Sequence, residues 1–201
     1  TLTQVTARQA LAFGVAPAIL PMTDAAVRTV LDTAAGRLPM QTYFVEHRCE
    51  PQVRDVAYIG ADKAEPTAQV AAALSDPDLQ GIVICPSNPY LSIGPMLAVP
   101  GIAALLRAAA APCVAVSPIV AGKAVKGPLG KMLLEMGITP GPAAILDHYG
   151  PLLDCLVVDP GDDLSSVDPA RIAVHPTLML NEADKIALAR VLVENVMAGL
   201  R

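Results

Sequence analysis

The chain has 201 residues and a formal net charge of −5, with 53% hydrophobic and only 3% aromatic residues. This length is enough for one well-buried domain, and an aliphatic core is typical of α/β proteins whose sheet is covered on both faces. The sequence has no basic tract, which argues against nucleic-acid binding, because surfaces that follow phosphates need clustered Lys and Arg. No apolar run is long enough to span a membrane, and no signal peptide is recognisable.

The four cysteines are scattered along the chain, at positions 49, 85, 113 and 155. No pair has the close spacing that zinc sites use, and the pattern does not resemble a disulfide framework. We therefore expect reduced, buried thiols in a cytoplasmic protein.

The first third of the chain predicts a helix followed by a small antiparallel sheet. Residues 3–13 have helical periodicity and end at Gly14, and "APAILPM", residues 16–22, predicts a short strand. Three further strands are expected at residues 27–33, 37–48 and 53–60. We therefore interpret residues 17–60 as a β-rich insert of hairpin type.

From residue 61 onward, strands alternate with helices. Apolar runs predict buried strands at residues 81–85, 113–117 and 155–159, with a fourth candidate at 170–175. Helices are expected at residues 66–76, 101–110, 129–136, 142–149 and 181–200. Asn181 is the expected N-cap of the last helix, with Asp184 at the capping-box distance. The alternation implies an α/β fold with a doubly wound, mostly parallel sheet. Residues 1–201 would form one domain, with residues 61–201 as its nucleotide-binding part.

Two of the expected strands lead into unusual loops rich in Ser, Gly and Pro. The first loop, "PSNPYLSIGP", covers residues 86–95, and its prolines and glycine predict an irregular path. The second loop, "SPIVAGKAVKGPLGK", covers residues 117–131. Because a single helix joins the two strands, both loops should lie together at the carboxyl ends of the sheet, where α/β proteins bind ligands.

The composition of these two loops favours anion or nucleotide binding. Small residues let backbone N–H groups approach an oxygen-rich ligand, and lysines supply positive charge where phosphate would lie. The candidate polar side chains are Ser87, Asn88, Ser92, Ser117, Lys123, Lys126 and Lys131. Neither loop matches a Walker motif or G-x-G-x-x-G, so spacing does not identify the nucleotide. The alternative is that Pro and Gly only shape two connections.

Other titratable residues give weaker indications. His148 follows Asp147, but adjacent residues on a helix point in different directions, so a surface or helix-ending histidine is favoured. His47 lies among charged residues and is expected at a solvated strand edge, and His175 has no visible partner. The acidic residues of "DPGDD" could bind a metal at a strand end or simply form a turn: Asp159, Asp162 and Asp163.

Several separate segments together resemble a known family. "PSNPYLSIGPMLAVPGI", "VAVSPIVAGKAVKGP" and "DHYGPLLDCLVVD", with "QTYFVEHRCEP" at residues 41–51, closely resemble the 2-phospho-L-lactate transferase family of coenzyme F420 biosynthesis. The resemblance implies a magnesium-dependent reaction between a guanosine-diphosphate-activated three-carbon acid and the deazaflavin alcohol Fo. The ribityl hydroxyl of Fo would attack the phosphorus carrying the acid, and GMP would leave. The acid would be phospholactate, phosphoenolpyruvate or a phosphoglycerate.

The resemblance also assigns site residues. The guanosine-diphosphate site would be lined by Ser87, Asn88, Pro89, Ser92, Gly94 and Pro95, with Ser117, Lys123 and Lys126 beside it. It identifies no catalytic residue and no metal ligand. The family opens with a glycine-rich strand-to-helix loop that this sequence does not contain, so we expect upstream residues to be missing and the 201 residues alone to be inactive.

Two further expectations concern the partners of the chain. The alternative function is a non-catalytic regulator of the related gluconeogenesis-factor type, which would bind a nucleotide sugar. The form of both loops favours the transferase over this regulator. The apolar final helix, residues 181–200, is compatible with a homodimer.

Overall fold

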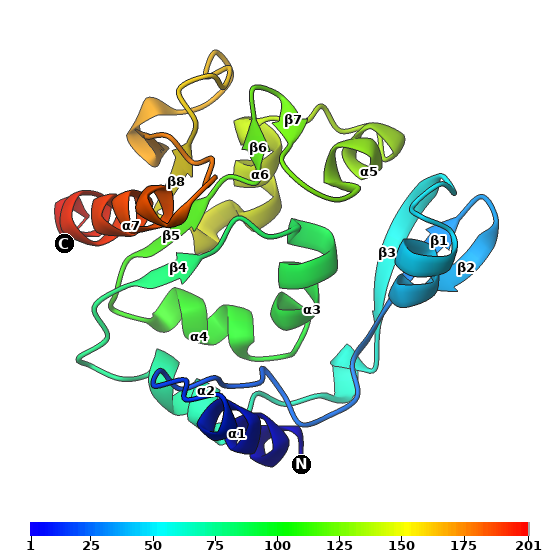
Figure 1. The fold of residues 1–201 in the computed structure, drawn as a ribbon, viewed down its shortest axis with the longest axis horizontal. Coiled ribbons are helices and arrows are strands. Elements are labelled where there is room, and N and C mark those ends of the chain that lie inside the picture. The colour runs from blue at the N-terminus through cyan, green and yellow to red at the C-terminus, as the bar shows by residue number, and fades with distance from the viewer. Residues whose placement is uncertain (201) are drawn as a thin grey trace.

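The centre of the protein is a four-stranded parallel sheet. The computed structural model describes residues 1–200 and orders the strands β4-β5-β8-β9 (Figure 1). These strands are β4 (Ile82–Ile84), β5 (Cys113–Val116), β8 (Cys155–Val158) and β9 (Ile172–Val174). Every residue of β5 and β8 is buried, which explains why both read as continuous apolar runs. The predicted α/β fold with a mostly parallel sheet is confirmed, including its fourth strand.

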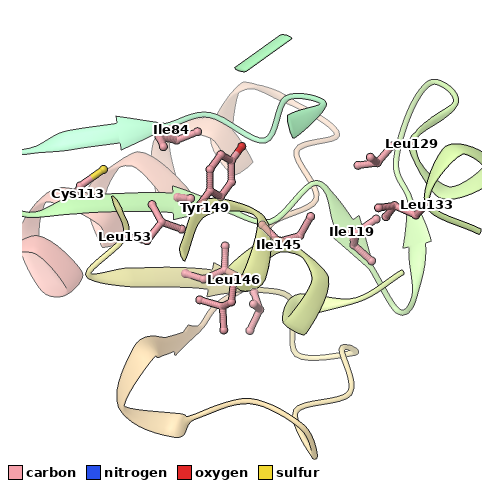
Figure 2. Close-up of a cluster of buried hydrophobic side chains, with 12 residues drawn as sticks. Ile84, Cys113, Ile119, Leu129, Leu133, Ile145, Leu146, Tyr149 and Leu153 are labelled. Carbon is pink, nitrogen blue, oxygen red and sulfur yellow. The ribbon is translucent and has the colours of Figure 1, made fainter. Parts of the chain in front are cut away.

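Helices cover both faces of this sheet. Side chains alternate between the faces along each strand, so Cys113 and Ala115 pack on one side and Val114 and Val116 on the other. The first face carries α6 (Pro142–Tyr149), and α5 (Leu129–Glu135) extends the same buried cluster beyond the strand ends, where Leu129 and Leu133 lie beside Ile119 (Figure 2). The second face carries α7 (Glu182–Arg190) and the turns after it. The sheet is therefore doubly wound.

A separate antiparallel sheet lies beside α5, at the right of Figure 1. Its order is β2-β1-β3, formed by β1 (Arg28–Thr33), β2 (Gly36–Pro39) and β3 (Val53–Ile59). It joins the rest of the protein through a buried cluster made by Leu31, Tyr43, Val53, Leu91 and Met132. The antiparallel hairpin predicted between residues 27 and 60 is thus present.

One predicted strand in this region is wrong, and another is shorter than predicted. Residues 16–22 pair with no strand, and their prolines lack the N–H groups that a strand ladder needs. The strand expected at residues 37–48 ends at Pro39, and a π-helical turn, Thr42–Glu46, follows it. This turn buries Tyr43 completely and lets its hydroxyl donate to the Cys49 carbonyl at 3.1 Å. Burial of one large side chain outweighs the strand-like sequence.

The first loop is also more regular than predicted. A π-helical turn, Pro89–Ile93, leads directly into α3 (Gly94–Leu97), and α4 (Ile102–Ala108) follows at an angle of 84° to this helical segment. The prolines do not prevent helix here, because Pro89 and Pro95 occupy first-turn positions that need no N–H donor. The second loop contains a short hairpin, β6 (Ile119–Val120) and β7 (Lys123–Ala124).

The remaining helices agree closely with the sequence predictions. The first is α1 (Leu2–Ala12), the next is α2 (Ala68–Leu74), and α7 continues through a π-helical turn into α8 (Met197–Gly199). Asn181 caps α7, and Asp184 completes the capping box. Of the four free cysteines, Cys113 and Cys155 are buried as predicted, but Cys85 is exposed and Cys49 is half-buried.

No single helix within residues 1–200 is long and apolar enough to cross a membrane. One bent pair of helices, Pro89–Leu97 with Ile102–Ala108, meets the criteria of length and composition only.

Candidate functional site

The carboxyl ends of the parallel strands surround a pocket of about 210 Å³. Its lining comes from the segments that follow β4, β5 and β9, and from the start of α5. The lining residues are Pro86, Asn88, Pro118, Val125, Lys126, Leu129, Thr177, Leu178 and Met179. This is the position at which open α/β sheets bind ligands. We call it the strand-end pocket.

Asn88 reaches this pocket as the N-cap of the turn Pro89–Ile93. Its Oδ1 accepts hydrogen bonds from the backbone N–H groups of Tyr90 at 2.9 Å and Leu91 at 3.0 Å. Its Nδ2 group meets only a weak sulfur acceptor, Met132, at 3.8 Å. Asn88 therefore organises the first loop with one end of its amide, and keeps donor capacity at the other end.

Two aromatic contacts fix the segment that follows Asn88. The Tyr58 hydroxyl on β3 donates to the Tyr90 carbonyl at 2.6 Å, and the Tyr90 and His148 rings lie 4.4 Å apart. Burial lowers the pKa of His148, and a hydrogen bond to the Pro89 carbonyl opposes that shift. His148 lies in the last turn of α6, as predicted, but no pattern in the sequence indicates its contact with Tyr90 of the first loop.

Ser117 supports the second loop from inside the core. It is 1% exposed, and its hydroxyl donates to the Ile119 carbonyl at 3.0 Å and accepts from the Ile119 N–H at 3.1 Å. Ala121 and Gly122 join β6 to β7 with φ values of +48° and +72°, as a two-residue type I′ hairpin turn requires. Ser117 thus fixes the base of the hairpin, and its hydroxyl is occupied by protein partners.

The three lysines of the second loop have different surroundings. Lys126 lines the strand-end pocket, whereas Lys123 is exposed on β7 and is not among the lining residues. Lys131 has protein partners outside the pocket: its ammonium group donates to the Pro51 carbonyl at 3.0 Å and pairs with Glu135 at 2.6 Å. The structure therefore brings Asn88 and Lys126 together and directs Lys131 to the antiparallel sheet.

The other predicted residues of the first loop lie on a second hollow. Ser87, Ser92 and Pro95 line an apolar groove of about 690 Å³, which β4, α2, α4 and residues 20–22 also border. Pro89 and Gly94, which belong to the same loop, are buried. The helical turn after Asn88 directs Ser92 and Pro95 away from the strand-end pocket, and Ser87 also faces the groove, so the first loop contributes to two hollows rather than one.

The acidic turn after β8 is held by internal hydrogen bonds. Asp159 Oδ1 accepts from the Gly161 N–H and Oδ2 accepts from the Thr177 N–H, both at 3.1 Å. Residues 1–200 contain no group of three His, Cys, Asp or Glu side chains arranged to hold a metal ion. Among the weaker candidates, the His175 ring lies 2.9 Å from the Pro176 carbonyl, and His47 ends the turn Thr42–Glu46.

The sequence predictions missed the part of the pocket formed by Thr177, Leu178 and Met179. A signal was available, since these residues follow β9 just as the first loop follows β4, and all carboxyl ends of a parallel sheet lie at one edge. The segment lacks Gly and carries no charge, so its composition does not indicate a ligand site.

A parallel sheet with helices on both faces and a pocket at its strand ends defines an α/β protein of the doubly wound class. Residues 1–195 match the sequence profile of the family described as 2-phospho-L-lactate transferase CofD. The chain belongs to the 2-phospho-L-lactate transferase family.

Individual relatives agree with this assignment. A 2-phospho-L-lactate transferase from Methanopyrus kandleri is 35% identical over 86% of this chain and 55% of its own length. One from Halobacterium salinarum is 38% identical over 94% of this chain and 54% of its own. A phosphoenolpyruvate transferase from Mycobacterium avium is 34% identical over the whole chain and 60% of its own length. The chain therefore spans little more than half the length of these relatives.

The fold has a counterpart among solved structures. A member of the UPF0052 family from Bacillus halodurans superposes with a TM-score of 0.60, covering 91% of this chain and 65% of its own. Because the sequences are only 18% identical, this likeness concerns the fold alone.

Proposed function

We propose that this chain is part of a transferase in coenzyme F420 biosynthesis. The enzyme would move a phosphorylated three-carbon acid from its guanosine-diphosphate-activated form to the ribityl hydroxyl of Fo and release GMP. The observation that carries the proposal is the convergence of Asn88 and Lys126 on one strand-end pocket, in a chain of this family. The relatives are named for two different acids, phospholactate and phosphoenolpyruvate, so the proposal covers both.

The chemistry of the pocket suits such a reaction. In phosphoryl-type transfer the nucleophile belongs to the substrate, so catalysis depends on positioning and on neutralising negative charge. Lys126 supplies a positive charge, and the Asn88 amide supplies a neutral donor. A pocket of about 210 Å³ is large enough for part of the activated acid, and the remainder would extend beyond it. A cytoplasmic location, where small charged substrates are available, is part of the proposal.

Magnesium is proposed as a requirement of the reaction, on the basis of the resemblance. The described residues do not form a metal site made by protein alone, because no three ligand-type side chains converge within residues 1–200. Magnesium commonly binds one or two carboxylates together with substrate phosphates, so no ligand is assigned here. The measurement is turnover of the full-length protein before and after EDTA treatment, and again after magnesium is restored.

The proposed site is tested with Lys126→Ala and a matched control, Lys185→Ala, which removes an exposed lysine on α7. Calorimetry with GDP in magnesium buffer should show about tenfold weaker binding for Lys126→Ala, the loss of one charge-assisted hydrogen bond of roughly 1.5 kcal/mol. Binding by Lys185→Ala should not change. Equal affinity in both variants would contradict the placement of the site.

A second variant tests Asn88 separately from its structural role. Asn88→Ser keeps an oxygen that can cap the turn Pro89–Ile93 but removes the amide donor, whereas Asn88→Ala removes both. We expect both variants to weaken GDP binding and to reduce transfer to Fo in the full-length protein. Preferential binding of a uridine nucleotide sugar over GDP by the unsubstituted protein would favour the non-catalytic regulator instead.

A further inference from the structure

The acidic turn after β8 lies between two parts of the strand-end pocket, as the strand order β4-β5-β8-β9 requires. The hairpin β6–β7 follows β5 on one side, and Thr177–Met179 follow β9 on the other. The turn contributes no residue to the pocket lining itself. Its side chains instead contact both neighbours.

Asp159 connects the turn to the segment after β9. One carboxylate oxygen accepts from the Thr177 N–H at 3.1 Å, and the other accepts from the Gly161 N–H at 3.1 Å. Both oxygens of Asp159 therefore serve as acceptors for backbone N–H groups. Thr177 is 4% exposed, and its Oγ1 is buried with no hydrogen-bond partner in the described protein. Asp159 thus holds a pocket segment that carries an unpaired hydroxyl.

Asp162 faces the hairpin on the other side. It is 9% exposed, and its Oδ2 accepts from the Asp159 N–H at 3.1 Å, while Oδ1 is buried without a partner at hydrogen-bonding distance. The hairpin tip lies on this side of the turn, because Ala121 and Gly122 border one small hollow together with Gly161 and Asp163, and their backbone N–H groups lie near the Asp162 carboxylate. Burial raises the pKa of Asp162 above its ordinary value, and these N–H groups oppose that rise.

The hairpin tip and the acidic turn also lie close together at Gly161 and Ala121. A Cβ atom at Gly161 would lie 3.5 Å from the Ala121 Cβ, which is ordinary contact distance. Ala121 has a φ of +48°, a left-handed conformation that is unfavourable for a non-glycine residue. A carboxylate in front of successive N–H groups in such a turn offsets this cost, because these groups form a concave site for negative charge.

We propose that Asp159 and Asp162 are positioning residues of the strand-end pocket. Asp159 fixes the segment Thr177–Met179. Asp162 fixes the tip of the β6–β7 hairpin and, through the hairpin, the placement of Lys126. The positioning itself stands on the contacts above, and only its effect on GDP binding rests on the proposed function.

The proposal requires carboxylates, because an amide cannot replace them. In Asn one oxygen becomes an NH₂ donor, which would face a backbone N–H group at either position. Asp159→Asn therefore loses one of its two acceptor oxygens. Asp162→Asn likewise loses one acceptor oxygen, either the one facing the Asp159 N–H or the one facing the hairpin tip. Asp163→Asn is the matched control, because exposed Asp163 uses a single oxygen to accept from the Ser165 N–H at 2.9 Å. Asn can keep that one bond.

Hydrogen exchange measured by mass spectrometry tests the two contacts separately. Asp162→Asn should raise exchange at least tenfold in residues 119–126 and leave 175–179 unchanged. Asp159→Asn should raise exchange in residues 175–179. Asp163→Asn should change neither segment, and protection of β5 should stay constant in all three variants. Unchanged exchange at 119–126 in Asp162→Asn, or a uniform rise across the protein, would overturn the proposal.

GDP titrations then separate this proposal from the proposed function. If both hold, Asp159→Asn and Asp162→Asn weaken GDP binding severalfold, and Asp163→Asn does not. If the unsubstituted protein does not bind GDP, the proposed function fails, while the exchange data still decide the positioning.

If Asp162→Asn does not fold, the unsubstituted protein supplies the test. The amide resonances of Ala121 and Gly122 should titrate together in acid, with a midpoint above the ordinary Asp value. Asp159 is the neighbouring carboxyl whose charge contributes to this shift. Resonances that do not respond in this range would equally overturn the role of Asp162.

Discussion

Gly94 is the position at which the structure makes its sharpest stability prediction. Gly94 begins α3 with ordinary helical backbone, at φ −51°, so conformational freedom does not require glycine there. Space does require it, because a Cβ atom would lie 2.7 Å from Tyr58 Cζ, closer still to its hydroxyl oxygen, and 3.0 Å from the Pro89 carbonyl. Gly94→Ala must therefore displace the Tyr58 ring and break its 2.6 Å hydrogen bond to Tyr90.

The expected cost follows from these contacts. Overpacking of a well-filled site costs about 1–3 kcal/mol, and the lost hydrogen bond adds roughly 1 kcal/mol. The better helix propensity of Ala returns about 1 kcal/mol, which leaves a net loss of about 1–3 kcal/mol. Urea unfolding followed by circular dichroism measures this change. Gly130→Ala on α5 is the control, since its Cβ would meet neighbours at 3.7 Å and should be neutral or stabilising.

A double-mutant cycle identifies Tyr58 as the cause. Tyr58→Phe removes the hydroxyl that a Gly94 side chain would meet first, so the cost of Gly94→Ala should be smaller in that background. Full additivity of the two substitutions, or a Gly94→Ala protein as stable as the unsubstituted one, would refute the argument from space.

Two further predictions concern the contacts around α5 and α6. Glu135→Ala should destabilise the protein by about 1–2 kcal/mol in urea unfolding, because the Val53 N–H loses its acceptor at 2.9 Å, whereas Glu135→Gln should keep most of the stability. His148 should make the protein less stable in mild acid. Its pKa is lowered by burial, so the unfolded chain takes up a proton first, and stability falls as pH drops below about 6.5, the unfolded value. Unfolding midpoints at pH 5.5 and 7.5 measure this, and a difference that persists unchanged in His148→Phe would contradict it.

Sequence patterns predicted the parts of the fold that depend on local signals. Continuous apolar runs located β5 and β8, and the side chains of Asn181 and Asp184 located the start of α7. The errors arose where a distant contact decides the structure. Residues 42–46 have a strand-like composition, but burial of Tyr43 against Val53 and Met132 turns them into helix. No pattern within the segment contains that information.

The candidate site shows the same division. Position after a strand correctly indicated that Asn88 and Lys126 would approach each other. Composition could not indicate that the helical segment after Asn88 directs Ser92 and Pro95 to the other hollow, because contacts with Tyr58 and His148 hold the start of this segment. The assignment of these residues to a nucleotide stays a prediction.

The antiparallel sheet, predicted as an insert, supports the site from outside the strand-end pocket. Its residues Leu31 and Val53 share one buried cluster with Leu91 of the first loop and Met132 of α5. The Met132 sulfur in turn accepts from the Asn88 amide, and Tyr58 of β3 holds the carbonyl two residues after Asn88. The pocket position of Asn88 therefore depends on side chains that lie between Leu31 and Tyr58, well before it in the sequence. Substitutions in this sheet that break these contacts should change ligand affinity as well as stability, although no residue of the sheet lines the strand-end pocket.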